Sequence, residues 1–132
     1  MTRVNAGVDP HELHRLHLIA EYREIPMVPA SIKRSLRTRK ITDILKDVPS
    51  AFTLNKGHVT FFANKIVYLE NRYERVSMEM LNRGYFVDSS RDPGFAGLPE
   101  QCYGTWEETP EARAIILERI ALRKAEKPHL YK

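Results

Sequence analysis

The stretch LHLIAEYREIP, residues 16–26, holds two side chains whose types and spacing could support chemistry. His17 and Glu24 are seven residues apart, so in a helix they lie on nearly the same face. An imidazole paired with a carboxylate suits acid–base work or contact with a phosphate. The alternative for His17 is a partly buried histidine that a neighbouring group satisfies, and the spacing alone does not decide between the two.

Glu24 continues a predicted apolar stripe formed by Leu13, Leu16 and Ala20, because residues 20 and 24 are one helical turn apart. A carboxylate there is expected to lose water and to meet the negative end of the helix dipole, and both effects raise its pKa. A carboxyl group with a raised pKa can move protons near neutral pH. The competing interpretation is a structural salt bridge from Glu24 to a nearby arginine. Spacing alone favours this salt bridge over a catalytic role.

His11, His14 and His17 recur every three residues in HELHRLH. A zinc-protease helix instead needs histidines four positions apart with a glutamate between them, and position 15 is Arg15. Successive steps of three also turn His17 about 240° away from His11. We therefore expect no metal ion and no cofactor, and His11 and His14 are interpreted as solvated helix residues.

The elements that must position these residues are helices. The start of a helix is indicated by Asp9 as the N-cap and Pro10 as the first helical residue. Glu12, three residues after the cap, completes a capping box. Gly84 is a natural helix stop. Apolar residues recur at helical spacing in a longer segment: Phe62, Ile66, Leu69, Tyr73, Val76 and Met80. The predicted elements are helices over 9–25, 29–37, 57–83 and 109–127, a loop with a helical turn over 41–56, and a long loop over 85–107.

No alternation at period two is present, so the predicted fold class is all-α. We expect one compact domain over residues 1–132, with three main helices, a short basic helix and a long loop. With 132 residues, 42% of them hydrophobic and 29% charged, the chain can bury one core.

The composition also indicates the cellular location and the kind of binding partner that we expect. There is no long apolar run and no leader pattern, so we expect neither a membrane span nor a signal peptide. The single cysteine, Cys102, fits a cytoplasmic location. The net charge of +4 indicates an acidic partner, of which nucleic acid is the commonest.

Three blocks together resemble the phage, viral and bacterial pyrimidine-dimer DNA glycosylases of the endonuclease V type. They are the Met-Thr-Arg start, AEYRE at 20–24 and GHVTFF at 57–62. The similarity extends from Thr2 to AEKP at 125–128. It implies a monomeric DNA-repair enzyme that acts on damaged double-stranded DNA, in a bacterial cell or a phage-infected host.

In that family the nucleophile is the α-amino group of the threonine exposed by removal of the initiator methionine, which corresponds to Thr2. Such an amine has a pKa of about 7.7–8.0, so part of it is unprotonated at neutral pH. The resemblance implies that it attacks the deoxyribose C1′, expels the base and leaves an imine that permits β-elimination, an abasic-site lyase step. The family's glutamate corresponds to Glu24, which would stabilise the sugar cation and manage protons.

The resemblance also implies a surface for DNA. Some basic side chains correspond to phosphate contacts around the lesion and others to the basic face of the last helix or to the basic helix near residue 33. Without the resemblance, these residues would be interpreted as a solvated charged face. The implied DNA-binding residues are Arg3, His17, Arg23, Lys33, Arg34, Arg119 and Arg123.

The sequence departs from the familiar members in places that concern lesion recognition. Met27 stands where those members carry an arginine beside the lesion, and the aromatic tail is reduced to Tyr131 and Lys132. Two alternatives therefore stand beside dimer cleavage: the same chemistry on another damaged or modified base, and a non-catalytic basic helical module that binds DNA. Thr2 and Glu24 favour an enzyme, because a pure binder needs neither.

Overall fold

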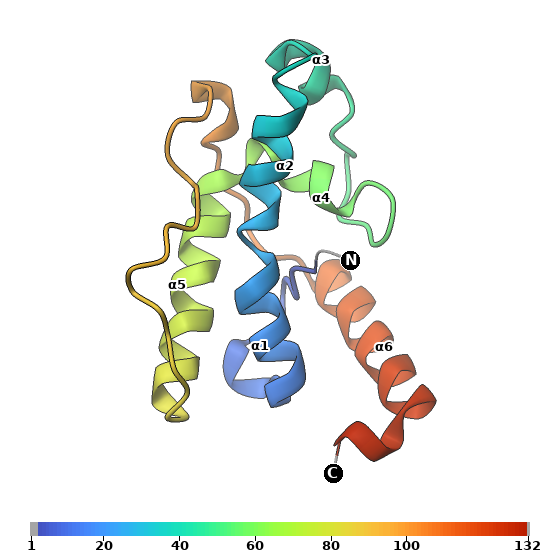
Figure 1. Ribbon diagram of the computed structural model, residues 1–132. Helices are drawn as coiled ribbons and strands as arrows, with labels where there is room; N and C mark the ends of the chain where they lie inside the picture. The colour runs from blue at the N-terminus through green and yellow to red at the C-terminus, as the bar shows by residue number, and fades with distance from the viewer. Residues whose placement is uncertain (1–2, 132) are drawn as a thin grey trace.

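Helix α1 (Arg15–Glu24) contacts α5 (Ile66–Asn82), and in Figure 1 α6 (Pro110–Glu126) extends on the other side of α1. The computed structural model describes residues 3–131. The chain in that range contains no strand, so the prediction of an all-α fold is confirmed. The other helices there are α2 (Met27–Ser35), α3 (Ile41–Lys46), α4 (His58–Phe61) and the 3-10 helices η1 (Pro10–Glu12), η2 (Phe62–Asn64), η3 (Glu100–Cys102) and η4 (Pro128–Tyr131).

The first predicted helix, over 9–25, is wrong as a single element. The Asp9–Glu12 capping box forms as expected, but it caps only η1. Leu13 and His14 then take extended backbone angles, and the His14 ring nitrogen Nδ1 accepts the amide of Leu16 at 3.2 Å. A side chain that caps the backbone in this way begins a new helix, so α1 starts only at Arg15.

Of the predicted apolar stripe of Leu13, Leu16 and Ala20, only Leu13 is buried, and it lies before α1 begins. The buried face of α1 is made by His17, Leu18, Glu21 and Tyr22, and Ile25 is buried just after it, whereas Leu16 and Ala20 are only half-buried. Leu18, Tyr22 and Ile25 follow the spacing of one helical face just as well. Glu24 therefore lies at the margin of the core.

The predicted long helix over 57–83 is interrupted at Lys65, whose φ of −133° and ψ of 38° lie outside the helical region. The Lys65 ammonium donates to the Phe61 carbonyl at 2.9 Å and to the Asn64 side chain at 2.8 Å, and these bonds stabilise the interruption. Gly84 has a φ of 81° and follows the end of α5, as predicted.

The long loop over 85–107 is held closely against α5. The Gly104 carbonyl accepts the Val67 amide at 3.1 Å. A side chain at position 104 would collide with the Asn64 carbonyl, so only glycine allows this approach. Just beyond it, Trp106 packs against Phe52 and Phe61, which are both buried in the core.

A buried ion pair joins α1 to α5. Arg72 donates from Nε to Glu21 Oε2 at 2.6 Å and from a terminal nitrogen to Glu21 Oε1 at 2.9 Å, and both side chains are fully buried. Arg72 also donates to the Val8 carbonyl at 2.7 Å, and Asn5 donates to Glu21 Oε1 at 2.9 Å. These bonds fix the N-terminal arm, residues 3–8, against both helices.

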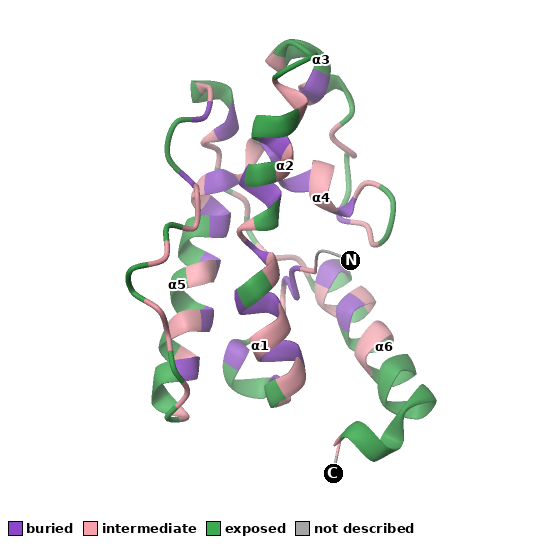
Figure 2. Cartoon of the chain, viewed as in Figure 1, coloured by how far each residue is buried: buried purple, intermediate pink, exposed green. Residues whose placement is uncertain are grey.

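The buried residues of helix α6 lie in its N-terminal half. Thr109 caps it by accepting the Ala112 amide at 3.0 Å, and the buried residues of α6 are Ala112 and Ile116. The backbone of Gly7 in the arm lies directly against Arg113. Residues 121–130 are exposed, and Figure 2 shows this end of α6 projecting away from α1. No helix in the described part of the chain is both long and apolar enough for a membrane span.

Candidate active site at the end of α1

The N-terminal arm runs from the core toward the end of α1. Its Val4 amide donates to the Nε2 atom of His58 at 2.9 Å, and Asn5 is held by Glu21. Val4 and Asn5 are fully buried, and Arg3 is half-buried. The predicted nucleophile, Thr2, lies outside the described residues.

Glu24 is the last residue of α1, and its carboxyl has an unusual environment. The Oε1 atom is buried and, among residues 3–131, has no hydrogen-bond partner. Burial raises the pKa of this carboxyl, while the nearby charges of Arg3 and Arg119 lower it by less. The described residues include no salt bridge to Glu24 that would support the structural interpretation, although the backbone of Arg3 also acts on this carboxyl through a hydrogen bond that lowers its pKa.

His17 connects the arm to the other end of the chain. A terminal nitrogen of Arg3 lies 3.3 Å from His17 Nδ1, and the Tyr131 hydroxyl lies 2.9 Å from His17 Nε2. A guanidinium can only donate, so Nδ1 accepts and Nε2–H donates to Tyr131. Burial, together with the charge of Arg3, lowers the pKa of His17 to about 4, so the ring is neutral near pH 7.

Arg119 brings α6 into the same site. Its guanidinium is half-buried, and burial together with the like charges of Arg3 and Arg123 lowers its pKa, while Glu24 raises it. Arg123 is exposed and also acts on His17. The structure thus gathers some of the sequence-predicted residues, called here the Glu24 cluster: Arg3, His17, Glu24, Arg119 and Arg123.

The other predicted DNA contacts are elsewhere. Arg23 is exposed and, at about 100° per residue, points to a different side of α1 from Glu24. It lines a hollow of about 440 Å³ that also contains Phe86. Lys33 donates to the Gly94 carbonyl at 2.9 Å, and Arg34 is exposed on α2. Within residues 3–131, neither Lys33 nor Arg34 makes a hydrogen bond or an ion pair with a member of the Glu24 cluster.

Sequence reasoning missed the buried polar residues that position the site. Glu21 was available as the other glutamate of AEYRE, and Arg72 stands three residues after Leu69 and four before Val76, the spacing of a core face. His58, the histidine of GHVTFF, is another such residue, since it is 2% exposed and bonded to the arm.

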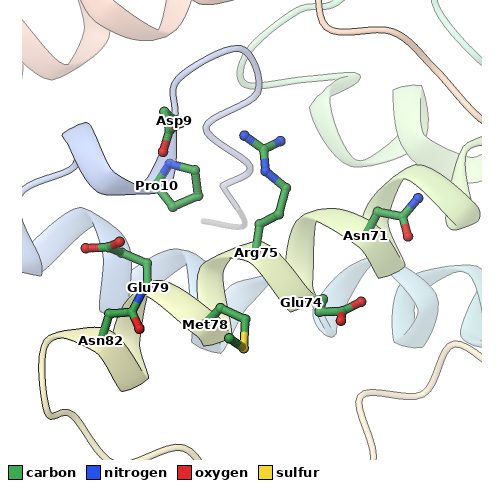
Figure 3. A pocket seen from close by; sticks show the side chains of 8 residues that line it. All are labelled: Asp9, Pro10, Asn71, Glu74, Arg75, Met78, Glu79 and Asn82. Carbon is green, nitrogen blue, oxygen red and sulfur yellow. The ribbon is translucent and has the colours of Figure 1, made fainter.

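A hollow of about 440 Å³ beside α5 is unrelated to the Glu24 cluster (Figure 3). Two of its charged side chains are partnered within the protein, since Glu79 pairs with Arg83 at 2.7 Å and Arg75 with Glu108 at 3.5 Å. The lining residues are Asp9, Pro10, Asn71, Glu74, Arg75, Met78, Glu79 and Asn82. No group of three or more His, Cys, Asp or Glu side chains in residues 3–131 is arranged to hold a metal ion.

A basic cluster around a partly desolvated glutamate agrees with the family that the sequence resembles. The sequence model described as pyrimidine dimer DNA glycosylase matches residues 1–92. That range includes the arm, α1 and GHVTFF, and it covers more than half of the chain. The chain therefore belongs to the pyrimidine dimer DNA glycosylase family of DNA-repair enzymes.

Proposed function

We propose that this protein cleaves the glycosidic bond of one base of a pyrimidine dimer in double-stranded DNA and then cleaves the strand at the abasic sugar, with the Thr2 amine as nucleophile. The amine lone pair bonds to the deoxyribose C1′ as the glycosidic bond breaks. The base keeps that electron pair, takes up a proton and stays joined to its neighbour through the cyclobutane ring. The nitrogen loses a proton, and the C1′–O4′ bond opens with delivery of a proton to O4′. The product is an iminium ion.

The iminium ion permits the lyase step. It acts as an electron sink, so loss of the C2′ proton gives an enamine, whose electrons expel the 3′ phosphate and break the C3′–O bond. No oxidant or metal is required by this sequence of steps. Water then hydrolyses the C=N bond, which frees the Thr2 amine and leaves an unsaturated sugar aldehyde on one side of the break and a 5′ phosphate on the other.

The observation that carries the proposal is the carboxyl of Glu24. Its buried Oε1 has no partner among the described residues, and burial raises its pKa. An ionised Glu24 would stabilise the cationic sugar, and its protonated form would deliver the proton to O4′. Arg3, which has a buried and unpartnered Nε atom, stands beside it. Buried polar atoms without partners are rare and require an explanation, and a bound nucleotide would supply one.

The remaining cationic residues are proposed to bind phosphates. Arg3, Arg119 and Arg123 would hold the strand around Glu24. The neutral His17 has one N–H, which donates to Tyr131, so a phosphate would bind it only by taking the place of the Tyr131 hydroxyl. Arg23, Lys33 and Arg34 would contact phosphates farther from the reacting sugar.

Borohydride trapping tests the proposal. Protein whose initiator methionine is absent, as verified by mass spectrometry, would be incubated with duplexes that hold a single cyclobutane dimer, a single abasic site or no damage. Borohydride should reduce the imine with the first two duplexes, and the DNA adduct should map to the N-terminal peptide. An adduct on an internal lysine would refute the assignment of Thr2.

Two controls separate the alternatives. Selective blocking of the α-amine should abolish trapping while binding to undamaged DNA persists. Trapping with the abasic duplex but not with the dimer would indicate the same chemistry on another base, and a panel of modified bases would identify it. Binding without any trapping would identify a non-catalytic DNA-binding module.

A further inference from the structure

His58 is a buried titratable residue that the proposed chemistry does not use. Its Nδ1 atom lies 2.8 Å from the Thr53 carbonyl, and its Nε2 atom lies 2.9 Å from the Val4 amide nitrogen. A carbonyl only accepts, so Nδ1 carries the proton, and an amide only donates, so Nε2 is bare. Both bonds hold together only for the neutral ring in this one tautomer.

The ring has little freedom to turn. Phe52 and Phe62 each pack edge-on against it, with ring centroids 5.4 Å away in both cases. His58 also opens α4 directly after Gly57, whose φ of 92° turns the chain there. A turned ring would lose both hydrogen bonds inside a packed core, which is costly.

The arm depends on this ring because it has no secondary structure of its own to hold it. Val4 belongs to no helix or strand, so its fully buried amide is satisfied by a side chain. The next residue, Asn5, is bonded through its side chain to Glu21. Val4 is two residues from Thr2, so the position of its amide limits where the terminal amine can reach.

We infer that His58 is a positioning residue, whose bare Nε2 fixes the arm at Val4 and so sets the reach of the Thr2 amine toward the deoxyribose C1′. This inference rests on the proposed function. Errors of about 1 Å in the placement of a reacting group can reduce a rate by about 10²-fold, so one lost hydrogen bond near the nucleophile is enough to matter.

Matched substitutions test the two ring nitrogens separately. In His58→Gln the amide oxygen can take the place of Nε2 and accept the Val4 amide. In His58→Asn the shorter amide can still donate to the Thr53 carbonyl but leaves Val4 without an acceptor. We expect His58→Asn to lower the single-turnover trapping rate on abasic duplex by about 10²-fold. His58→Gln should recover most of that rate.

The KM for DNA should change less than the trapping rate, because Arg119 and Arg123 of the Glu24 cluster lie on α6 and not on the arm. Amide hydrogen exchange at Val4 gives a readout that does not depend on activity. The Val4 amide should be protected in wild type and in His58→Gln and should exchange faster in His58→Asn. Circular dichroism and thermal unfolding would establish that each variant is folded.

The results distinguish this inference from the proposed function. If wild type forms no adduct while the Val4 amide is protected by His58, the proposed function fails, but the hydrogen bond that holds the arm to His58 is still established. If His58→Asn exposes the Val4 amide but traps DNA at the wild-type rate, the positioning role is refuted. Equal Val4 protection in the two variants would also refute it.

Discussion

Two glutamates three residues apart on α1 have opposite environments. Glu21 is fully buried and accepts hydrogen bonds from Arg72 and Asn5, so its charge is compensated. Glu24 is half-buried, and one of its oxygens has no partner in the described chain. Burial raises the pKa of Glu24 more than the charges of Arg3 and Arg119 lower it, so its ionised form destabilises the fold but is available for a substrate.

We expect Glu24→Gln to lower glycosylase activity by about 10²–10⁴-fold or more, the range for loss of an acid–base group. The same change should raise the melting temperature at pH 7–8. Because burial raises the folded-state pKa, the ionised carboxyl destabilises the folded state at high pH, and this cost disappears as pH falls below the unfolded value. Calorimetry from pH 4 to 8 should therefore show the two proteins converging at low pH. Glu21→Gln, the control, should destabilise the protein at pH 7.

His17 should remain neutral until strongly acidic pH. Its pKa is lowered to about 4, chiefly by burial, so stability that depends on the neutral ring is present above pH 6.5 and is lost as pH falls toward 4. Nitrogen-15 NMR should show a bare Nδ1 and a protonated Nε2 at pH 7. A titration midpoint near 6.5 would contradict the buried contact with Arg3 and Tyr131.

The helices are joined by buried polar contacts as well as by apolar packing. Arg72 connects α5 to α1 through Glu21 and to the arm through the Val8 carbonyl. The contact bridges segments that lie far apart in the sequence. Loss of one partner leaves a charge in the core, which is more damaging than loss of the whole pair.

Arg72→Met should reduce the free energy of unfolding by about 3–5 kcal/mol. The double variant with Glu21→Leu should recover part of this loss, because no charge is then left unpaired. Arg75→Ala is a suitable control, since Arg75 is 45% exposed beside Glu108 and such pairs contribute about 1 kcal/mol or less. Urea unfolding followed by circular dichroism measures all three. Equal losses in Arg72→Met and Arg75→Ala would contradict this account of the core.

Local sequence signals predicted helix caps better than helix continuity. The box at Asp9 and the stop at Gly84 depend on neighbouring residues, and both were predicted. The breaks at His14 and Lys65 arise because side chains there bond to the backbone, and an apolar pattern does not reveal such bonds. The partners of Glu21 could not be predicted because Arg72 is distant in the sequence. The gathering of Arg3, Glu24 and Arg119 was expected only from the family resemblance.

Over the whole molecule, cationic residues from both ends of the chain meet near Glu24. Arg3 comes from the arm and Arg119 from α6, which lies outside the part matched by the family. The far half of α6 is exposed and carries Arg123 and Lys124. A strand of DNA bound at Glu24 would therefore meet α6 as well as α1.

The slope of the logarithm of the DNA association constant, K, against the logarithm of the salt concentration should become less negative by about 0.9 in Arg123→Ala. This is the value for one phosphate contact. Lys46→Ala removes the same charge on α3, at the end of the molecule away from α6 (Figure 1), and should leave the slope unchanged. Fluorescence anisotropy on undamaged duplex between 50 and 200 mM salt measures both. Equal flattening in the two variants would mean that general charge, and not the α6 surface, governs binding.

The contact of Gly104 with the start of α5 also has a consequence for the order of events during synthesis. Asn64 and Val67 leave the ribosome long before Gly104, and Trp106 and Glu108 follow it. Until they arrive, the aromatic core lacks its indole ring, and Arg72 lacks the Glu108 carboxylate that stands 3.5 Å away. Pairings between residues distant in the sequence slow folding, because the loop between them must close first. A nascent chain that ends near residue 92 would hold the whole segment that the family model matches and would lack these later contacts.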